Sequence, residues 1–293
     1  MKNFNLSIYG NIILDNVYYI SDFRNGTSNI IEKKYTSVGS IGNMLAPLGK
    51  DITIQILSKV SNDYEGNKIL SLLSENISEK TSIDVQISSN NKTSNALIVS
   101  DIFKNTRTSM VEWGICRTID NIEAIKGDWV HFMYLDTLDN LGCTSLSKMD
   151  KNKIISADLC LGKHSQEQTE KIMNMLEYID YLILSDVEAK SLTSGQKNGI
   201  WRSYCMEEAA KIISKKVKKM VIIHSPHGSI TCDKDGITQT YSSEFISSKR
   251  MNVLGAGDLF ASSFIKKMIE SHDVDKSIKY AHKNTTLILK QRD

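Results

Sequence analysis

The chain has 293 residues, of which 41% are hydrophobic and 24% charged, and its formal net charge is +2. This composition is typical of a globular protein, and so small a net charge favours neither nucleic acid nor a membrane surface as a partner. No apolar run approaches the length of a membrane span, and the N-terminus lacks the core of a signal peptide, which together predict a cytoplasmic protein. The five cysteines are far apart and show no zinc-site spacing, so we expect reduced thiols.

Apolar runs that read as buried strands alternate with amphipathic segments along the chain. The expected strands are 6–9, 52–57, 129–134, 153–157, 181–184 and 220–223. Helical periodicity extends over 64–76, 165–178, 205–218, 256–270 and 274–290. The alternation predicts an α/β fold, a three-layer α/β/α sandwich with a mostly parallel central sheet.

Two stretches, 15–37 and 85–112, break this alternation with short β-leaning runs. They predict a small antiparallel sheet that is inserted into a single domain spanning residues 1–293. A sheet attached beside a binding cleft can act as a lid. Residues 229–241 read as a hairpin that turns at Asp235-Gly236.

The segment Gly255-Ala256-Gly257-Asp258 precedes an apolar helical pattern. The residues of that pattern are Leu259, Phe260, Phe264, Ile265, Met268 and Ile269. Backbone N–H groups at a helix N-terminus have no intrahelical partner, and the helix dipole adds partial positive charge, so the turn could hold a phosphoryl group. Asp258 would then stand beside that anion and could take a proton from a hydroxyl. The competing interpretation is an ordinary helix start, where Gly and Asp are common.

Several further motifs follow one another in a characteristic order. They are Gly10–Asp15, Val38–Gly49, Val60–Gly66, Thr93, Arg107, Ala157-Asp158 and Ser185–Glu188. Together with the turn before Asp258, they resemble the motifs of the ribokinase-like (PfkB) family of sugar and nucleoside kinases. The resemblance covers nearly the whole chain.

The resemblance implies an ATP-dependent sugar kinase that transfers the γ-phosphoryl group to a hydroxyl of a carbohydrate, and we expect a primary hydroxyl. It implies Asp258 as the general base and Gly255, Ala256 and Gly257 as the anion hole. The implied substrate residues are Asp15, Gly39, Asn43 and Arg107. The implied ATP-binding residues are Ser185, Ser225 and Gly228, and Glu188 is implied to hold Mg²⁺. The partner would be a small sugar, and the resemblance also suggests a homodimer through the lid.

Elementary chemistry supports several of these roles and also offers alternatives. Asp15 can accept two hydrogen bonds from sugar hydroxyls, Asn43 can both donate and accept, and Gly39 would let the backbone approach a ligand closely. Alternatively, Asp15 caps a turn, Asn43 is a helix N-cap, and Glu188 is an acid favoured in a first helical turn.

The chain departs from the family pattern mainly on the nucleotide side. The substituted positions are Ser40, Ser61, Ser185, Ile223, Ser225, Asn252, Val253 and Leu254. These departures leave ATP affinity and the identity of the donor open. In addition, Pro47 falls inside the helix that follows Asn43, where we expect a kink or a short helix.

Three other functions stay open. A nucleoside kinase would need an aromatic wall, for which Tyr18, Tyr19, Phe103 and Trp113 are candidates in the lid stretches. A phosphosugar kinase could use Arg24, Lys33, Lys34 and Arg107 to pair with a substrate phosphate. A sugar sensor that has lost turnover is suggested by the altered loop at Ser225.

Overall fold

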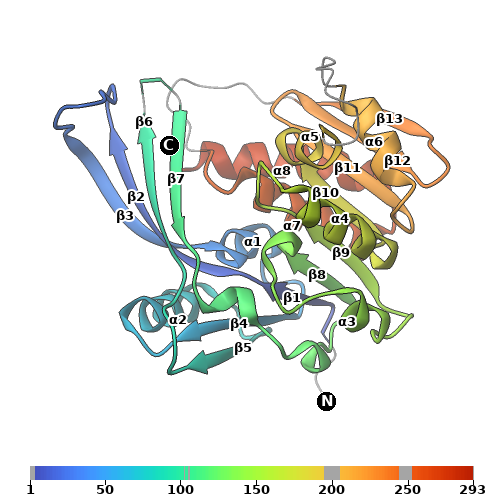
Figure 1. The fold of residues 1–293 in the computed structure, drawn as a ribbon, viewed down its shortest axis with the longest axis horizontal. Helices are drawn as coiled ribbons and strands as arrows, with labels where there is room; N and C mark the ends of the chain where they lie inside the picture. Colours follow the sequence, from blue (N-terminus) through green and yellow to red (C-terminus); the bar gives the residue numbers. More distant parts are fainter. Residues whose placement is uncertain (1–3, 102, 105, 195–204, 244–252, 293) are drawn as a thin grey trace.

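The computed structural model describes residues 4–101, 103–104, 106–194, 205–243 and 253–292 (Figure 1). In these ranges the chain forms a large sheet with helices on both faces and a separate small sheet at one end. The α/β architecture expected from the sequence is confirmed. Among the described helices, none is long and apolar enough to cross a membrane.

The large sheet has nine strands within the described residues, in the order β13-β12-β11-β10-β9-β8-β1-β4-β5. Its strands are β1 (Leu6–Gly10), β4 (Ile54–Ser61), β5 (Thr81–Ser88), β8 (Trp129–Met133), β9 (Ile154–Asp158), β10 (Tyr181–Ser185), β11 (Met220–Ser225), β12 (Gly228–Asp233) and β13 (Thr238–Ser242). The pairs from β5 to β11 are parallel, and β12 and β13 form the expected hairpin at the edge.

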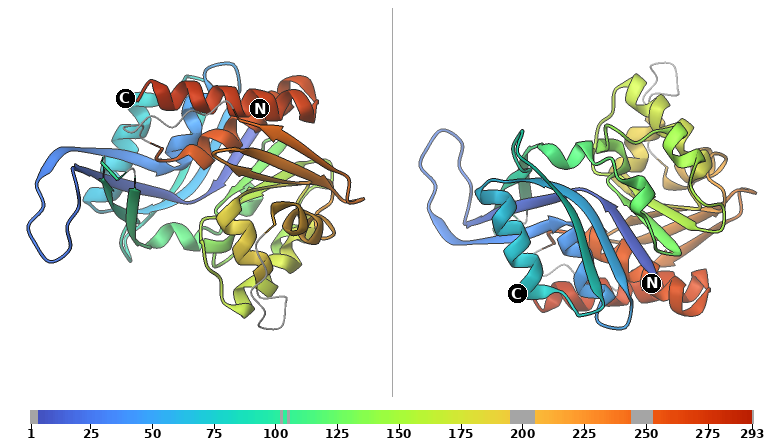
Figure 2. Two further views of the ribbon diagram at one scale, coloured as in Figure 1. Left: turned by 90° about the horizontal axis from the view of Figure 1, so that it is seen from above. Right: turned by 90° about the horizontal axis from the view of Figure 1, so that it is seen from below.

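Helices cover both faces of this sheet (Figure 2). They are α1 (Ile41–Leu48), α2 (Tyr64–Asn76), α3 (Cys143–Ser147), α4 (Gln166–Met175), α5 (Asp186–Ser194), α6 (Met206–Ser214), α7 (Ala256–Ser271) and α8 (Val274–Lys290), with short 3₁₀ turns η1 (Ile115–Thr118), η2 (Ile122–Ala124), η3 (Leu135–Thr137) and η4 (Leu176–Tyr178). The helix containing Pro47 is short, with eight residues, as expected.

Successive residues of the central strands are buried on opposite faces of the sheet. Leu182 and Val221 pack in one hydrophobic cluster, whereas Ile183 and Ile222 pack in the other, together with Phe264 of α7. This is the two-residue period of a strand that is covered on both sides, and it explains why these strands appear as continuous apolar runs.

The small sheet consists of β2 (Ile12–Ile20), β3 (Ile31–Ser40), β6 (Asn95–Asp101) and β7 (Thr106–Glu112), in the order β3-β2-β6-β7. The sequence predicted an antiparallel sheet, but this sheet is mixed, because β2 pairs with β6 in parallel. Residues 85–88, expected in this sheet, belong to β5 of the large one. β2 follows β1, and β6 follows β5, so both strands leave parallel strands of the large sheet in the same direction (Figure 1).

Candidate active site

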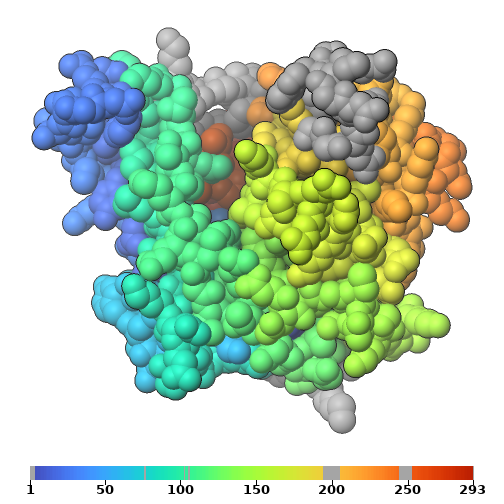
Figure 3. Space-filling model, in the orientation of Figure 1, coloured from blue at the N-terminus to red at the C-terminus, as the bar shows by residue number. Residues whose placement is uncertain are grey.

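A cavity of about 630 Å³ lies between the small sheet and the carboxyl ends of the central strands. Tyr134, Asp158, Ser185 and His224 line it from the ends of four neighbouring parallel strands. The first turn of α7 lines it as well. Figure 3 shows the corresponding hollow between the green strands of the small sheet and the yellow-green body. Ligands of open α/β sheets generally bind at this edge.

Asp258, in the first turn of α7, lies in this cavity and is only 5% exposed. Its Oδ2 accepts a hydrogen bond from Asn43 Nδ2 (2.8 Å), and its Oδ1 accepts one from the Tyr134 hydroxyl (3.1 Å). Burial, with a further contribution from the nearby Asp158 carboxylate, raises the pKa of Asp258 to about 7. The carboxyl group is thus fixed in orientation and titrates near neutral pH, as suits a general base.

The turn that precedes α7 depends on glycine. Gly255 has a φ of 70°, and a Cβ atom there would lie 2.6 Å from Cγ of Asn43. The Ala256 N–H donates to the Val253 carbonyl (3.2 Å), so this amide is already engaged. Within the described part of the chain, the Gly257 N–H makes no hydrogen bond. The turn therefore offers fewer open amides than the three that the sequence suggested.

Asp15 lies in β2 and is 6% exposed, with its carboxylate in the cavity. Burial raises its pKa to about 7, and the positive charge of Arg107 partly opposes this effect. A Cβ atom on Gly39 would overlap the Asp15 carboxylate, so Gly39 supports Asp15 from outside the cavity lining. The carboxylate makes no hydrogen bond to any of the described residues, which leaves both oxygens for a ligand.

Two alternative interpretations of the sequence are wrong. Asp15 does not cap a turn, because it sits within β2 and pairs with Ser37 and Ala96. Asn43 is not an N-cap, because α1 begins at Ile41 and Asn43 is its third residue.

The small sheet contributes apolar side chains and the positively charged Arg107 to the cavity lining. Its cavity face carries Ile13, Ala96, Ile98 and Val111, with Trp113 just beyond β7. Arg107 also lines the cavity, and its Nη1 lies 3.5 Å from the Val253 carbonyl, in the loop before Gly255.

The other lid residues considered from the sequence lie elsewhere. Tyr19 stacks on Tyr35, Phe103 is 76% exposed, and Arg24 pairs with Asp22 in the segment between β2 and β3. None of these three lines the cavity.

Ser185 and Glu188 form a capping box at the start of α5. The Ser185 N–H donates to Glu188 Oε2 (2.7 Å), and the Glu188 N–H donates to Ser185 Oγ (3.3 Å). Burial raises the pKa of Glu188 to about 8, and the carboxylates of Asp158 and Asp136 add to this rise. The Ser-x-x-Glu spacing could have revealed this cap from the sequence.

The described residues contain no group of three or more side chains that could hold a metal ion directly. Glu188 nevertheless lines the cavity close enough to Asp158 and Asp136 for their charges to raise its pKa. A bound cation would favour the ionised form of Glu188, so this cluster of carboxyl groups would suit a hydrated Mg²⁺ held mainly by ligand phosphates, with Glu188 contacting it through water.

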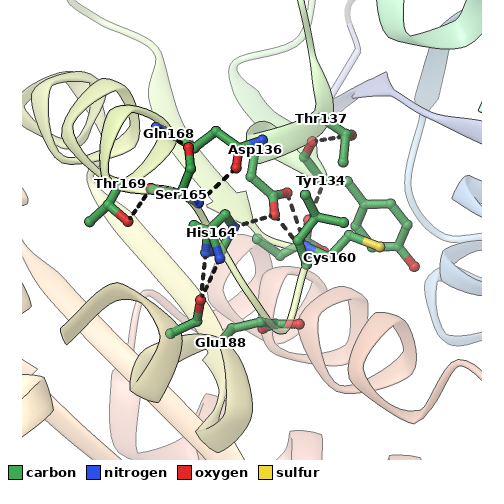
Figure 4. A network of polar contacts seen from close by, with 12 residues as sticks. Tyr134, Asp136, Thr137, Cys160, His164, Ser165, Gln168, Thr169 and Glu188 are labelled. Carbon is green, nitrogen blue, oxygen red and sulfur yellow. Dashed lines mark hydrogen bonds and ion pairs between the residues drawn. The ribbon is translucent and has the colours of Figure 1, made fainter. Parts of the chain in front are cut away.

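Asp136 and His164 hold the loop at residues 159–162, which lines the cavity. Figure 4 shows this network of polar contacts. Asp136 accepts from the N–H groups of Cys160 (3.0 Å) and Leu161 (2.8 Å) and contacts His164 Nε2 (2.8 Å). The His164 Nδ1 atom lies 2.8 Å from Ser191 Oγ on α5. Asp136, His164 and Tyr134 were not singled out from the sequence, because no motif marks them.

Ser225 and Gly228 do not line the cavity; they form the turn between β11 and β12. Ser225 Oγ donates to the Gly228 carbonyl (3.1 Å) and accepts from the His227 N–H (3.3 Å). Gly228 has a φ of 149°, and a Cβ atom there would overlap the Tyr241 carbonyl. The neighbouring His224 takes their place in the lining.

Comparison with known proteins agrees with this geometry. Residues 43–293 match the model of the pfkB family of carbohydrate kinases. The chain belongs to this family. Its members are phosphotransferases, and the resemblance noted in the sequence is confirmed.

The relatives of the chain act on different substrates. The chain is 25% identical over 129 residues to a 5-dehydro-2-deoxygluconokinase of Listeria monocytogenes. This match covers 43% of the chain and 37% of that relative. The fold of the chain is similar to that of Anopheles gambiae adenosine kinase in complex with P1,P4-di(adenosine-5) tetraphosphate (TM-score 0.78, 14% identity, 99% of this chain and 96% of the other). It is also similar to Thermotoga maritima ribokinase (TM-score 0.76, 15% identity, 98% and 93%).

Proposed function

We propose that the protein transfers the γ-phosphoryl group of ATP to a hydroxyl group of a small carbohydrate, with Asp258 as the general base. The observation that carries this proposal is the setting of Asp258: a buried carboxyl with a pKa of about 7, held by Asn43 and Tyr134 beside the glycine turn that starts α7. Membership of the pfkB family supports the reaction type.

In this mechanism Asp15 and Arg107 hold the acceptor so that one hydroxyl faces Asp258. Asp258 takes the hydroxyl proton while the oxygen forms a bond to the γ-phosphorus, and the bond from that phosphorus to the bridging oxygen of ADP breaks. The open Gly257 amide and the N-terminus of α7 stabilise the charge on the transferred group. Mg²⁺, held with Glu188 through water, would neutralise phosphate charge. Closure of the small sheet would exclude water.

A nucleoside acceptor is the second candidate function, and the lid wall favours it. Ile13, Ala96, Ile98, Val111 and Trp113 present an apolar and aromatic surface to the cavity. Such a surface suits a planar base better than a free sugar, whose hydroxyls would lose their hydrogen bonds to water against it. The similarity in fold to an adenosine kinase is compatible with this reading.

A screen for ADP release over sugars, phosphosugars and nucleosides tests these proposals. One class of acceptor should release ADP, and the Asp258→Asn enzyme should be about 10²–10⁴-fold slower with a similar KM. Asp128→Asn, an exposed aspartate outside the cavity, is the matched control and should keep full activity. Wild-type turnover by Asp258→Asn would refute the assigned base. Acceptor binding without any ADP release would favour a sensor.

We also propose that the lid mediates a homodimer. Its edge strands are β3 and β7, and every residue of β7 is exposed, so the edge is open for pairing with a second copy. Light scattering should give the mass of a dimer, and a proline in β7 should convert it to a monomer. A monomeric wild-type protein would contradict this proposal.

A further inference from the structure

His224 lines the cavity, although the sequence analysis singled out only its neighbours Ser225 and Gly228 in this loop. It lies near the carboxyl end of β11, directly opposite Ser185 of β10. The Cε1–Nε2 edge of its ring faces the glycine turn: a Cβ atom placed on Gly257 would lie 3.5 Å from Cε1 and 3.7 Å from Nε2. The other side of the ring packs against Phe260 of α7, with 4.8 Å between the ring centroids.

The imidazole of His224 has unused hydrogen-bonding capacity. Within the part of the chain that the structure describes, its ring nitrogens make no hydrogen bond, although the ring lines the cavity. Burial, with a smaller contribution from His282, lowers the pKa of His224 to about 4. The ring is therefore neutral near pH 7 and carries one N–H donor and one acceptor nitrogen.

Among the described histidines, only His224 has ring atoms within 4 Å of a Cβ atom placed on Gly257. His282 also contacts Phe260, with 5.0 Å between the ring centroids, but its Nε2 lies 2.8 Å from Ser229 Oγ, and it does not line the cavity. The ring edge of His224 therefore lies beside the turn that holds the phosphoryl group in the proposed function.

The anion site itself lacks a donor that the sequence led us to expect. The Ala256 N–H is engaged by the Val253 carbonyl, and Ser225 lies outside the cavity lining. We propose that the His224 imidazole N–H supplies this donor and hydrogen-bonds to the γ-phosphoryl group of ATP beside the Gly257 amide. This inference rests on the proposed function and adds a phosphoryl-binding residue to it.

The test compares nucleotides that differ in the γ-phosphoryl group. Calorimetry measures the affinities of the non-hydrolysable analogue AMP-PNP and of ADP, each with Mg²⁺, for the wild-type protein and three variants. His224→Phe keeps the ring against Phe260 but removes the donor, and His224→Gln keeps an N–H near the position of Nε2. His272→Asn, on the exposed C-cap of α7 where φ is 54°, is the matched control, since Asn tolerates this conformation.

We expect His224→Phe to weaken AMP-PNP binding about tenfold and to leave ADP binding unchanged, because one hydrogen bond to the γ-phosphoryl group is lost. His224→Gln should bind AMP-PNP more tightly than His224→Phe does, and His272→Asn should bind both nucleotides as the wild-type protein does. Equal weakening of both nucleotides, or no change in either, would overturn the role of His224 while leaving the kinase proposal intact. A wild-type protein that binds neither nucleotide would overturn the ATP-dependent function and this inference with it.

Discussion

Asp15 and Asp258 share one physical cause for their raised pKa but differ in their partners. Both are buried in the cavity, and burial raises the pKa of each to about 7. Asp258 is held by two side chains, whereas Asp15 has no hydrogen-bond partner among the described residues. The fixed carboxyl suits proton transfer, and the unpaired one suits recognition of a hydroxyl-bearing ligand.

The pH dependence of the reaction should follow Asp258. The base acts as a carboxylate, so kcat/KM should rise about tenfold per pH unit up to about pH 7 and level off above it. The rising limb should persist in Asp15→Asn at lower overall activity and vanish from the residual activity of Asp258→Asn. A limb that disappears only in Asp15→Asn would assign the titration to substrate binding.

Asp15 should lower the stability of the ligand-free protein as the pH rises. Because its folded pKa is raised, its stabilising contribution is complete below the unfolded pKa, near 3.8, and is lost as the pH rises through about 7. The change in the free energy of unfolding caused by Asp15→Asn should therefore be more favourable near pH 8 than near pH 5, by on the order of 1–3 kcal/mol. Urea unfolding at both pH values measures this. An equal change in the free energy of unfolding at the two pH values would contradict burial as the cause of the raised pKa of Asp15.

At the scale of secondary structure, the sequence predicted what local patterns determine. Helices 64–76 and 274–290 match α2 and α8 because their apolar periodicity is continuous and Asp63 and Asp273 cap them. The role of Tyr134 could not be predicted, because its position depends on a left-handed conformation after β8 and on a contact with Asp258, 124 residues away.

The capping box of α5 allows the two roles of Glu188 to be separated. Glutamine also serves at this position of a capping box, so near pH 4, where the Glu188 carboxyl is protonated in both the folded and the unfolded chain, Glu188→Gln should change the free energy of unfolding by less than about 0.5 kcal/mol. The Mg²⁺ concentration for half-maximal activity should nevertheless rise about tenfold or more, since the charge is lost. Ser185→Ala should instead cost about 1 kcal/mol of stability through the cap. An unchanged Mg²⁺ requirement in Glu188→Gln would leave Glu188 a purely structural role.

At the scale of the whole molecule, the site forms where two sheets meet. Asp15 comes from the small sheet, Asn43 from α1 and Asp258 from α7, so segments more than 200 residues apart in the chain share one cavity. The motifs identified these residues, but pairing within the small sheet could not be inferred. The parallel register of β2 with β6 depends on how both strands leave the large sheet, and strand composition does not encode this.

Arg107 links the two parts of the molecule, and its removal should affect the acceptor more than the chemistry. Its guanidinium lies 3.5 Å from the Val253 carbonyl and opposes the rise in the pKa of Asp15, so it acts on both the turn before α7 and the acceptor site. Arg107→Gln should raise the KM for the acceptor about tenfold, the loss expected for one charge-assisted hydrogen bond, and change kcat less because Asp258 keeps its partners. Arg24→Gln is the matched control, since Arg24 is exposed, pairs with Asp22 and does not line the cavity. Steady-state kinetics on both variants decides the matter: an equal rise in KM for the two would point to a general effect of charge on the small sheet and against a specific contact with the acceptor.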